Sequence, residues 1–91
     1  MGSFFWGINM KLEYFYFDGC PFCSMVEREI KSLNIKVDYC DIYGDSAHLD
    51  RLVKDTGRRT VPCLYIDDEP MFESRDIIQW LKQNQDKLPK V

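Results

Sequence analysis

Several features are scarce or absent in this 91-residue sequence, and each absence excludes a class of function. Basic residues do not outnumber acidic ones: 12 Lys and Arg stand against 15 Asp and Glu, which gives a formal net charge of −3. Because nucleic-acid binding requires a positively charged surface, this balance argues against DNA and RNA as partners. The sequence has no internal repeat and no low-complexity segment, so its length fits one domain.

The sequence also lacks a long apolar run of the kind that a membrane-spanning helix needs, which is about 20 residues. The apolar segment at residues 3–8 (SFFWGI) is far shorter, and it lacks the charged and apolar regions of a signal peptide. We therefore expect a cytoplasmic protein with no membrane partner. We interpret residues 1–9 as an N-terminal extension that is flexible or artificial, and residues 10–91 as the domain. Alternatively, Phe4, Phe5 and Trp6 pack on the domain or on a second chain, so a weak dimer stays open beside the expected monomer.

A zinc site would need a second close pair of Cys or His residues beside Cys20 and Cys23, and the sequence has none. We therefore expect no metal. The other cysteines, Cys40 and Cys63, lie far apart, and His48 is the single histidine. Because Val, Ile, Leu and Phe suffice for a core without disulfides, the cysteines favour a reducing cytosol over a secreted scaffold. We interpret Cys40 as a bystander thiol.

Hydrophobic periodicity predicts the element order β-α-β-α-β-β-α. Predicted strands span residues 11–17, 35–41, 61–66 and 70–72, and predicted helices begin at Pro21, near Ser46 and at the N-cap residue Ser74. The βαβ start gives two parallel strands joined by a right-handed crossover, and the later hairpin adds two antiparallel strands. The expected fold is therefore an α/β, thioredoxin-like architecture, with a four-stranded mixed sheet flanked by helices.

The motif that carries chemistry is CPFC at residues 20–23, between a predicted strand and a predicted helix. There we expect Cys20 to be partly exposed at the positive end of the helix dipole, which favours the thiolate over the thiol. Cys23 lies one helical turn further along and can attack a mixed disulfide formed on Cys20. The motif thus predicts thiol–disulfide exchange, with Cys20 as the nucleophile and Cys23 as the resolving thiol.

A second signal follows at residues 58–62 (RRTVP). A proline at the start of a strand favours either a cis peptide bond or the blunting of an edge strand. A cis Val61–Pro62 bond would turn the Val61 backbone toward a ligand groove, where it could pair with an extended peptide-like substrate. Each signal alone is moderate, but the two together are specific.

On these residues, the sequence from about Met10 to its end resembles the glutaredoxin family. The matching motifs are CPFC at 20–23, TGRRTVP at 56–62 and ESRDI at 73–77. The last motif is also similar to the N-terminal domain of glutathione transferases. The resemblance implies a glutathione-disulfide oxidoreductase that reduces protein disulfides and glutathione mixed disulfides, in electron transport and cell redox homeostasis. Glutathione would be its co-substrate, and disulfide-containing or glutathionylated proteins its partners.

The resemblance also implies a set of contacts with glutathione. Cys20 would hold the glutathione mixed disulfide, and Thr60 and Val61 would meet the cysteinyl backbone of glutathione. The complete implied binding set is Phe22, Arg58, Arg59, Thr60, Val61, Pro62, Glu73, Ser74 and Arg75.

Within this set, charged groups of glutathione are assigned to particular residues. Ser74 and the free N–H of Arg75 would hold the γ-glutamyl carboxylate, which agrees with the affinity of helix N-termini for carboxylates. Glu73 would take the γ-glutamyl ammonium group. Arg58, and Arg59 beside it, would pair with the glycyl carboxylate.

Three positions depart from the family pattern. Phe17 stands where many glutaredoxins have a lysine, so one cation near the nucleophile is lost, and the neighbouring Asp18 disfavours the thiolate. Phe72-Glu73 replaces a double-glycine turn. Cys63 stands where a non-cysteine is usual, and we interpret it as a small buried residue, with a third redox thiol as the alternative.

Two other functions stay open. The missing lysine at Phe17 favours a redoxin of this shape that is reduced by thioredoxin reductase, whereas Glu73-Ser74 disfavours it. The other is a glutaredoxin that binds an iron–sulfur cluster between two chains through its nucleophilic cysteine and bound glutathione. Pro21 argues against the cluster, because proline at this position is thought to hinder cluster binding in the family.

Overall fold

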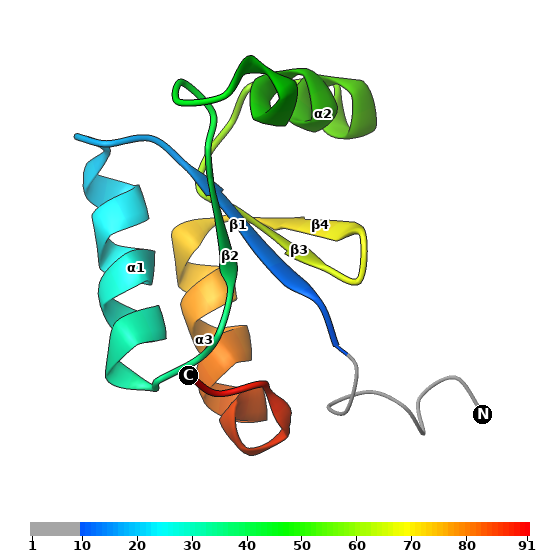
Figure 1. Ribbon diagram of the computed structural model, residues 1–91. Helices are drawn as coiled ribbons and strands as arrows, with labels where there is room; N and C mark the ends of the chain where they lie inside the picture. The colour runs from blue at the N-terminus through cyan, green and yellow to red at the C-terminus, as the bar shows by residue number, and fades with distance from the viewer. Residues whose placement is uncertain (1–9) are drawn as a thin grey trace.

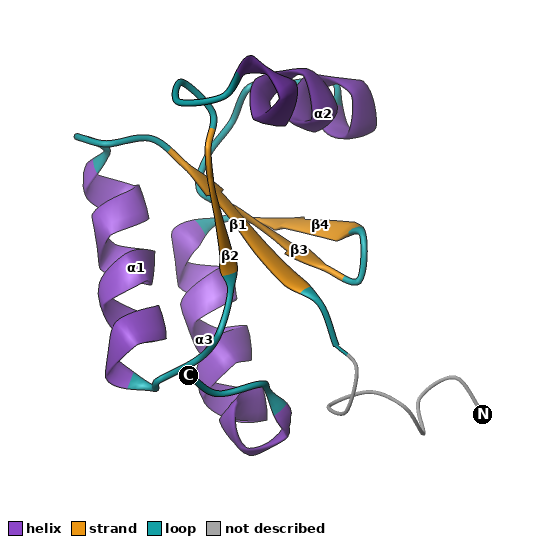
Figure 2. Ribbon diagram, in the orientation of Figure 1, coloured by secondary structure: helices purple, strands orange, loops and turns teal. Residues whose placement is uncertain are grey.

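The computed structural model describes residues 10–91, so the interpretation of residues 1–9 lies outside the described residues. The predicted order of strands and helices is confirmed (Figures 1 and 2). The elements are β1 (Leu12–Tyr16), α1 (Pro21–Ser32), β2 (Asp38–Asp41), α2 (Ser46–Thr56), β3 (Cys63–Ile66), β4 (Glu69–Phe72), α3 (Ser74–Asn84) and the short 3-10 helix η2 (Gln85–Lys87).

The strands form one mixed sheet in the order β2-β1-β3-β4. β1 and β2 are parallel, because α1 carries the chain back between them. β3 is antiparallel to β1, and β4 is antiparallel to β3 across the turn at Asp67 and Asp68, both of which have a positive φ. The α/β class and the four-stranded mixed sheet predicted from the sequence are confirmed.

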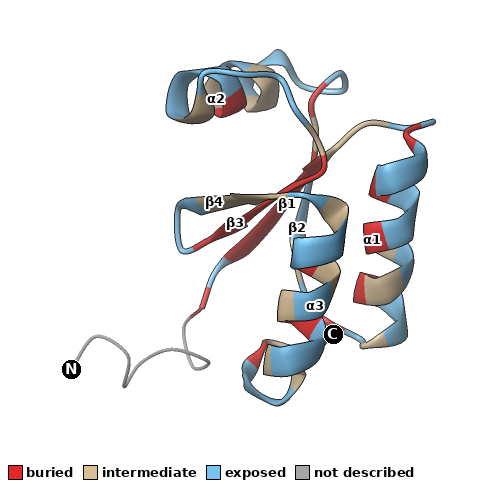
Figure 3. Cartoon of the chain, turned by 180° about the vertical axis from the view of Figure 1, so that it is seen from behind, coloured by how far each residue is buried: buried red, intermediate tan, exposed pale blue. Residues whose placement is uncertain are grey.

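Alternation along the strands divides the core into two hydrophobic clusters, one on each face of the sheet. On one face, Leu12 and Tyr14 of β1 pack with Val26 of α1 and Ile77 of α3. On the other face, a second cluster gathers beneath α2: Phe15, Cys40, Ile42, Leu52, Cys63 and Tyr65. Figure 3 shows β1 and β3 as the buried strands of the sheet, with buried residues also on the inner sides of α1 and α3. Among residues 10–91 no helix is long and apolar enough to cross a membrane.

Three predicted boundaries are wrong for a structural reason, while the ends of β1 and the start of β4 differ from the prediction by one residue. β3 begins at Cys63 rather than at residue 61, because Pro62 has no N–H to donate to the sheet. β2 begins at Asp38 rather than at residue 35, because Ile35 forms an isolated antiparallel bridge with Lys90, far away in the sequence. The N-cap of α3 is Glu73 rather than Ser74, and Ser74 is the first residue of the helix. Glu73 takes the cap position with a φ of 74°, in the region that favours glycine.

Candidate active site

Cys20 lies where β1 leads into α1, after a turn in which Gly19 has a φ of 91°. It is the N-cap of α1, and Pro21 occupies the first turn of that helix. The Cys23 backbone N–H donates to the Cys20 sulfur over 3.4 Å. This contact, together with the helix dipole, stabilises negative charge on the sulfur. The prediction that Cys20 is partly exposed is wrong: the residue is 7% exposed, because its sulfur folds back over the first turn of α1.

Cys23 is more deeply buried than Cys20, at 1% exposed. Burial raises the pKa of the Cys23 thiol to about 12, while hydrogen bonding to the Phe17 backbone and the Tyr14 side chain opposes that rise. Cys23 is therefore a thiol at neutral pH. Both cysteines are free, so this is the reduced state of the pair. The difference in their surroundings suits Cys20 to attack first and Cys23 to act on a disulfide that Cys20 already carries.

Most of the predicted glutathione-binding residues lie together beside this pair. A groove of about 210 Å³ is lined by Phe22, Thr60, Val61, Pro62, Glu73 and Ser74. The Val61–Pro62 peptide bond is cis. A neighbouring hollow of about 430 Å³ shares Phe22, Glu73 and Ser74 with the groove and adds Arg75. Segments from α1, the loop before β3 and the start of α3 thus converge on one surface.

The start of α3 gives this surface free backbone donors. The first hydrogen bond within the helix runs from the Ile77 N–H to the Glu73 carbonyl over 2.9 Å. The N–H groups of Ser74, Arg75 and Asp76 precede that bond, and no side chain of the described chain caps the helix. An uncapped helix start with free N–H groups favours a carboxylate ligand, although the Asp76 side chain in the same turn opposes it.

The structure does not bring Arg58 and Arg59 to this groove. They line a separate, shallower hollow of about 620 Å³ alongside α2. The guanidinium carbon of Arg58 lies 4.4 Å from the centroid of the Phe72 ring, so that side chain rests on an aromatic ring of β4.

Cys40 and Cys63 belong to the cluster beneath α2. They flank Phe15, which pairs with Cys40 of β2 and with Cys63 of β3. Burial raises the pKa of Cys40 to about 11 and that of Cys63 to about 12. Cys63 is thus a small buried residue, as interpreted from the sequence, and Cys40 is buried beside Phe15 as well. α1 with its Cys23 packs on the opposite face of the sheet.

The sequence reasoning missed Tyr14, whose hydroxyl donates to the Cys23 carbonyl oxygen over 2.6 Å. A signal was available, because alternation places Tyr14 on the same apolar face as Leu12. A buried tyrosine needs a partner for its hydroxyl. The partner itself depends on how α1 packs against β1, which local sequence does not specify.

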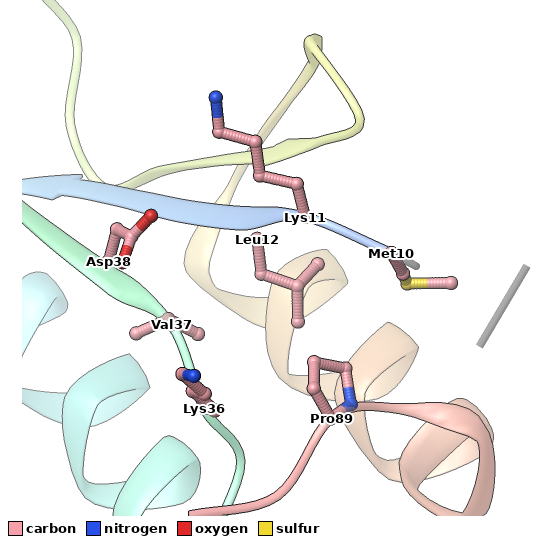
Figure 4. A pocket seen from close by; sticks show the side chains of 7 residues that line it. All are labelled: Met10, Lys11, Leu12, Lys36, Val37, Asp38 and Pro89. Atoms are coloured by element: carbon pink, nitrogen blue, oxygen red, sulfur yellow. The ribbon is translucent and has the colours of Figure 1, made fainter. Parts of the chain in front are cut away.

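Figure 4 shows another pocket, which lies around the start of β1, whereas Cys20 follows the other end of that strand. It has a volume of about 280 Å³ and is lined by Met10, Lys11, Leu12, Lys36, Val37, Asp38 and Pro89. It contains no cysteine, and β1 separates it from the CPFC turn. Within residues 10–91, no group of three or more His, Cys, Asp or Glu residues is arranged to hold a metal ion.

Comparisons with known proteins agree with this geometry. The glutaredoxin family model matches residues 12–71. Among solved structures, the thioredoxin-like protein BC3987 is 29% identical with a TM-score of 0.70, and the match covers 80% of this chain and 97% of that one. The buckwheat glutaredoxin–glutathione complex is 19% identical with a TM-score of 0.68, covering 91% of this chain and 80% of that one.

A glutathione transferase homologue from Drosophila mojavensis with bound glutathione is 20% identical, with a TM-score of 0.72. That match covers 84% of this chain but 36% of the transferase homologue. The likeness to the buckwheat and Drosophila proteins establishes the thioredoxin-like fold. No curated protein matches this chain.

Proposed function

This chain belongs to the glutaredoxin family, and on that premise we propose that it is a glutathione-dependent thiol–disulfide oxidoreductase acting through the dithiol Cys20–Cys23. One observation carries the proposal. A sulfur at the N-terminus of α1 stands beside a groove lined by Val61, Ser74 and their neighbours. A nucleophilic sulfur next to a groove with free backbone donors suits a substrate that has both a disulfide and a carboxylate.

The reaction on a glutathione mixed disulfide proceeds through two exchanges. The Cys20 thiolate attacks the sulfur of the glutathionyl group, the substrate–glutathione S–S bond breaks, and the substrate leaves as a thiolate that takes up a proton. A second glutathione thiolate then attacks the glutathionyl sulfur on Cys20. This step releases oxidised glutathione and restores the Cys20 thiolate. In sum, the mixed disulfide is reduced to the substrate thiol, glutathione is oxidised to its disulfide, and no other oxidant or reductant takes part.

A protein disulfide follows a different second step. Cys20 attacks one sulfur of the substrate disulfide, and Cys23 then attacks the Cys20 sulfur of the mixed disulfide, which frees the reduced substrate. The product is a Cys20–Cys23 disulfide, which glutathione reduces. The burial of Cys23 keeps it protonated until this step, so Cys20 alone makes the first attack.

The groove residues are assigned by the chemistry of glutathione. The free N–H groups at the start of α3 and the Ser74 hydroxyl would receive the γ-glutamyl carboxylate. The Glu73 carboxylate would take the γ-glutamyl ammonium group, and the Val61 backbone would pair with the cysteinyl unit. The glycyl carboxylate is left without a cationic partner in this groove, because Arg58 and Arg59 line the other hollow.

The test is glutathione-dependent reduction of a small glutathione mixed disulfide by wild type, Cys20→Ser and Cys23→Ser. Cys20→Ser is expected to be inactive. Cys23→Ser is expected to keep its activity on this substrate and to lose activity on a protein disulfide. The proposal fails if wild type shows no glutathione-dependent turnover, or if Cys20→Ser retains it.

A second candidate is a redoxin of the same dithiol chemistry that receives electrons from thioredoxin reductase. Two observations favour it: the 29% identity to a thioredoxin-like protein across nearly all of that chain, and Phe17 in place of a cation near Cys20. Omitting glutathione and supplying thioredoxin reductase with NADPH separates the two. Turnover under those conditions alone would support the second candidate.

A further inference from the structure

Tyr14 connects the central strand to the turn that carries the resolving thiol. It lies in β1, it is 0% exposed, and its hydroxyl donates to the Cys23 carbonyl oxygen over 2.6 Å. Its ring is fixed by neighbouring aromatic rings. The Tyr16 ring stacks on it at a centroid distance of 5.6 Å, and the Tyr39 ring meets it edge-on at 6.1 Å. The hydroxyl therefore has a set position beneath the first turn of α1.

Cys23 is the group whose chemistry this hydroxyl can change. To attack the Cys20 sulfur, the Cys23 thiol must lose its proton in a buried place, where charge is costly. Hydrogen bonding from the Tyr14 side chain lowers the pKa of Cys23 against the larger effect of burial. Burial holds the pKa of Tyr14 itself well above its ordinary value, so Tyr14 stays protonated and remains a donor.

We propose that Tyr14 is a positioning residue for the resolving thiol: its hydroxyl holds the Cys23 turn against β1 and donates to the Cys23 sulfur as that sulfur becomes a thiolate. Tyr14 then acts mainly on the dithiol step, in which the Cys23 thiolate forms, and has a smaller effect on the exchange at Cys20. The inference rests on the proposed function for the identity of the bound thiol, glutathione.

The step concerned is balanced as a thiol–disulfide exchange. The Cys23 thiol gives its proton to solvent, and the Cys23 thiolate attacks the Cys20 sulfur of the Cys20–glutathione disulfide. The bond between Cys20 and glutathione breaks as the Cys20–Cys23 bond forms. Glutathione leaves as a thiolate and takes up a proton. Tyr14 gives up no proton; its O–H group turns from the Cys23 carbonyl oxygen toward the sulfur as the negative charge develops there.

The main experiment loads Cys20 with glutathione and follows the release of glutathione in a single turnover, for wild type and Tyr14→Phe. Because a hydrogen bond to a charged group is lost, release is expected to be roughly tenfold slower in Tyr14→Phe. In a Cys23→Ser background, Tyr14→Phe is expected to slow glutathione-dependent turnover of a small mixed disulfide by far less than tenfold, because no Cys23 thiolate forms in that reaction.

Tyr65→Phe is the matched control. Tyr65 is also 0% exposed and lies in the same sheet, but its hydroxyl donates to Asp55 on the side of α2. The variant Tyr65→Phe should therefore release glutathione at the wild-type rate. The inference is overturned if Tyr14→Phe releases glutathione as fast as wild type or if Tyr65→Phe is equally slow. The inference is also overturned if, in the Cys23→Ser background, Tyr14→Phe slows turnover of the small mixed disulfide as much as it slows the release of glutathione in a single turnover.

A second readout needs no glutathione, so it separates this inference from the proposed function. In Cys20→Ser, the alkylation of Cys23 by iodoacetamide is measured from neutral to alkaline pH, with the modified peptide identified by mass. Tyr14→Phe is expected to slow this alkylation at neutral pH by roughly tenfold and to move its midpoint to higher pH. If wild type fails to use glutathione but this shift is present, the proposed function fails and the role of Tyr14 stands. If wild type uses glutathione normally but Tyr14→Phe does not shift the alkylation of Cys23, the role of Tyr14 fails and the proposed function stands.

Discussion

At the scale of single residues, Glu73 combines an unfavourable backbone with a functional position. It adopts a φ of 74° although it has a side chain, and it lines the groove beside Cys20. A residue other than glycine in this region costs about 1–3 kcal/mol, and such residues gather at functional sites. The strained backbone of Glu73 therefore agrees with the proposed role of its carboxylate in binding the γ-glutamyl ammonium group.

Two substitutions separate strain from binding at Glu73. Glu73→Ala keeps the positive φ on a residue with a side chain, whereas Glu73→Gly relieves it. We expect Glu73→Gly to be more stable than Glu73→Ala by about 1 kcal/mol in urea unfolding. Both should raise the KM for glutathione to the same extent, because both lack the carboxylate. Equal stability of the two variants would show that the backbone here is not strained.

At the scale of the elements, the start of α3 is the part of the groove that favours negative charge. Ser74→Asp adds a carboxylate where the γ-glutamyl carboxylate is proposed to bind, so the KM for glutathione should rise roughly tenfold. The same change should not destabilise the helix, because an acidic residue in the first turn complements the helix dipole. Steady-state kinetics and thermal unfolding measure the two effects.

Ser46→Asp is the control for this prediction. Ser46 is the first residue of α2, so the substitution adds the same charge at a helix start that does not line the groove. It should leave the KM for glutathione unchanged. A similar rise in KM for both variants would mean that the effect comes from the net charge of the protein and not from the start of α3.

α2 is anchored to the sheet by Arg51. Its guanidinium donates to Glu13 of β1 over 2.7 Å and to Asp68 over 2.9 Å, and it lies 4.5 Å from the centroid of the Tyr65 ring. Glu13 is buried, and its Oε1 atom has no hydrogen-bond partner among residues 10–91. The exposed Lys11 Nζ lies 3.7 Å from the same carboxylate, so Arg51 is the closer and main partner that compensates the charge of Glu13.

Arg51→Leu should therefore destabilise the protein by about 1–3 kcal/mol in urea unfolding, because a buried carboxylate loses its main partner. Adding Glu13→Leu should recover part of this loss, since no unpaired charge is then left buried. Lys31→Leu breaks the Glu27–Lys31 pair, which has a similar 2.9 Å separation but is exposed, and it should remain within error of wild type. If the double variant is less stable than Arg51→Leu, this explanation is wrong.

Local sequence predicted those parts of the fold and site that depend on local chemistry. The aromatic-rich residues 11–17 predicted a strand, which is β1, and the end of α2 is also local, because Gly57 caps that helix with a φ of 78°. The CPFC and TVP motifs predicted the residues that meet at the groove. The differences arose where distant segments meet. Ile35 pairs with Lys90, which shortens β2, and the place of Arg58 on the Phe72 ring depends on how the loop before β3 lies against β4.

At the scale of the whole molecule, both hydrophobic clusters bury groups that ionise at alkaline pH. The thiols of Cys23, Cys40 and Cys63 have pKa values raised from 9.0 to about 12, 11 and 12. The pKa values of the buried Tyr14 and Tyr65 are also raised, from 10.0, chiefly by burial. The thiols lie in α1, β2 and β3, so their protonation is a property of the folded core as a whole.

This arrangement predicts that stability falls as the solution becomes alkaline. The folded state holds these protons to higher pH than the unfolded state, so above pH 9.0 the unfolded chain binds fewer protons and is increasingly favoured. The stabilisation is complete below pH 9.0 and declines until the folded groups ionise near pH 12. Urea unfolding in the presence of a reductant should show a midpoint that decreases through this window. Tyr65→Phe should show a shallower decrease, because one of the buried groups no longer titrates. A midpoint that stays constant to strongly alkaline pH would contradict the burial of these thiols and phenols in the folded core.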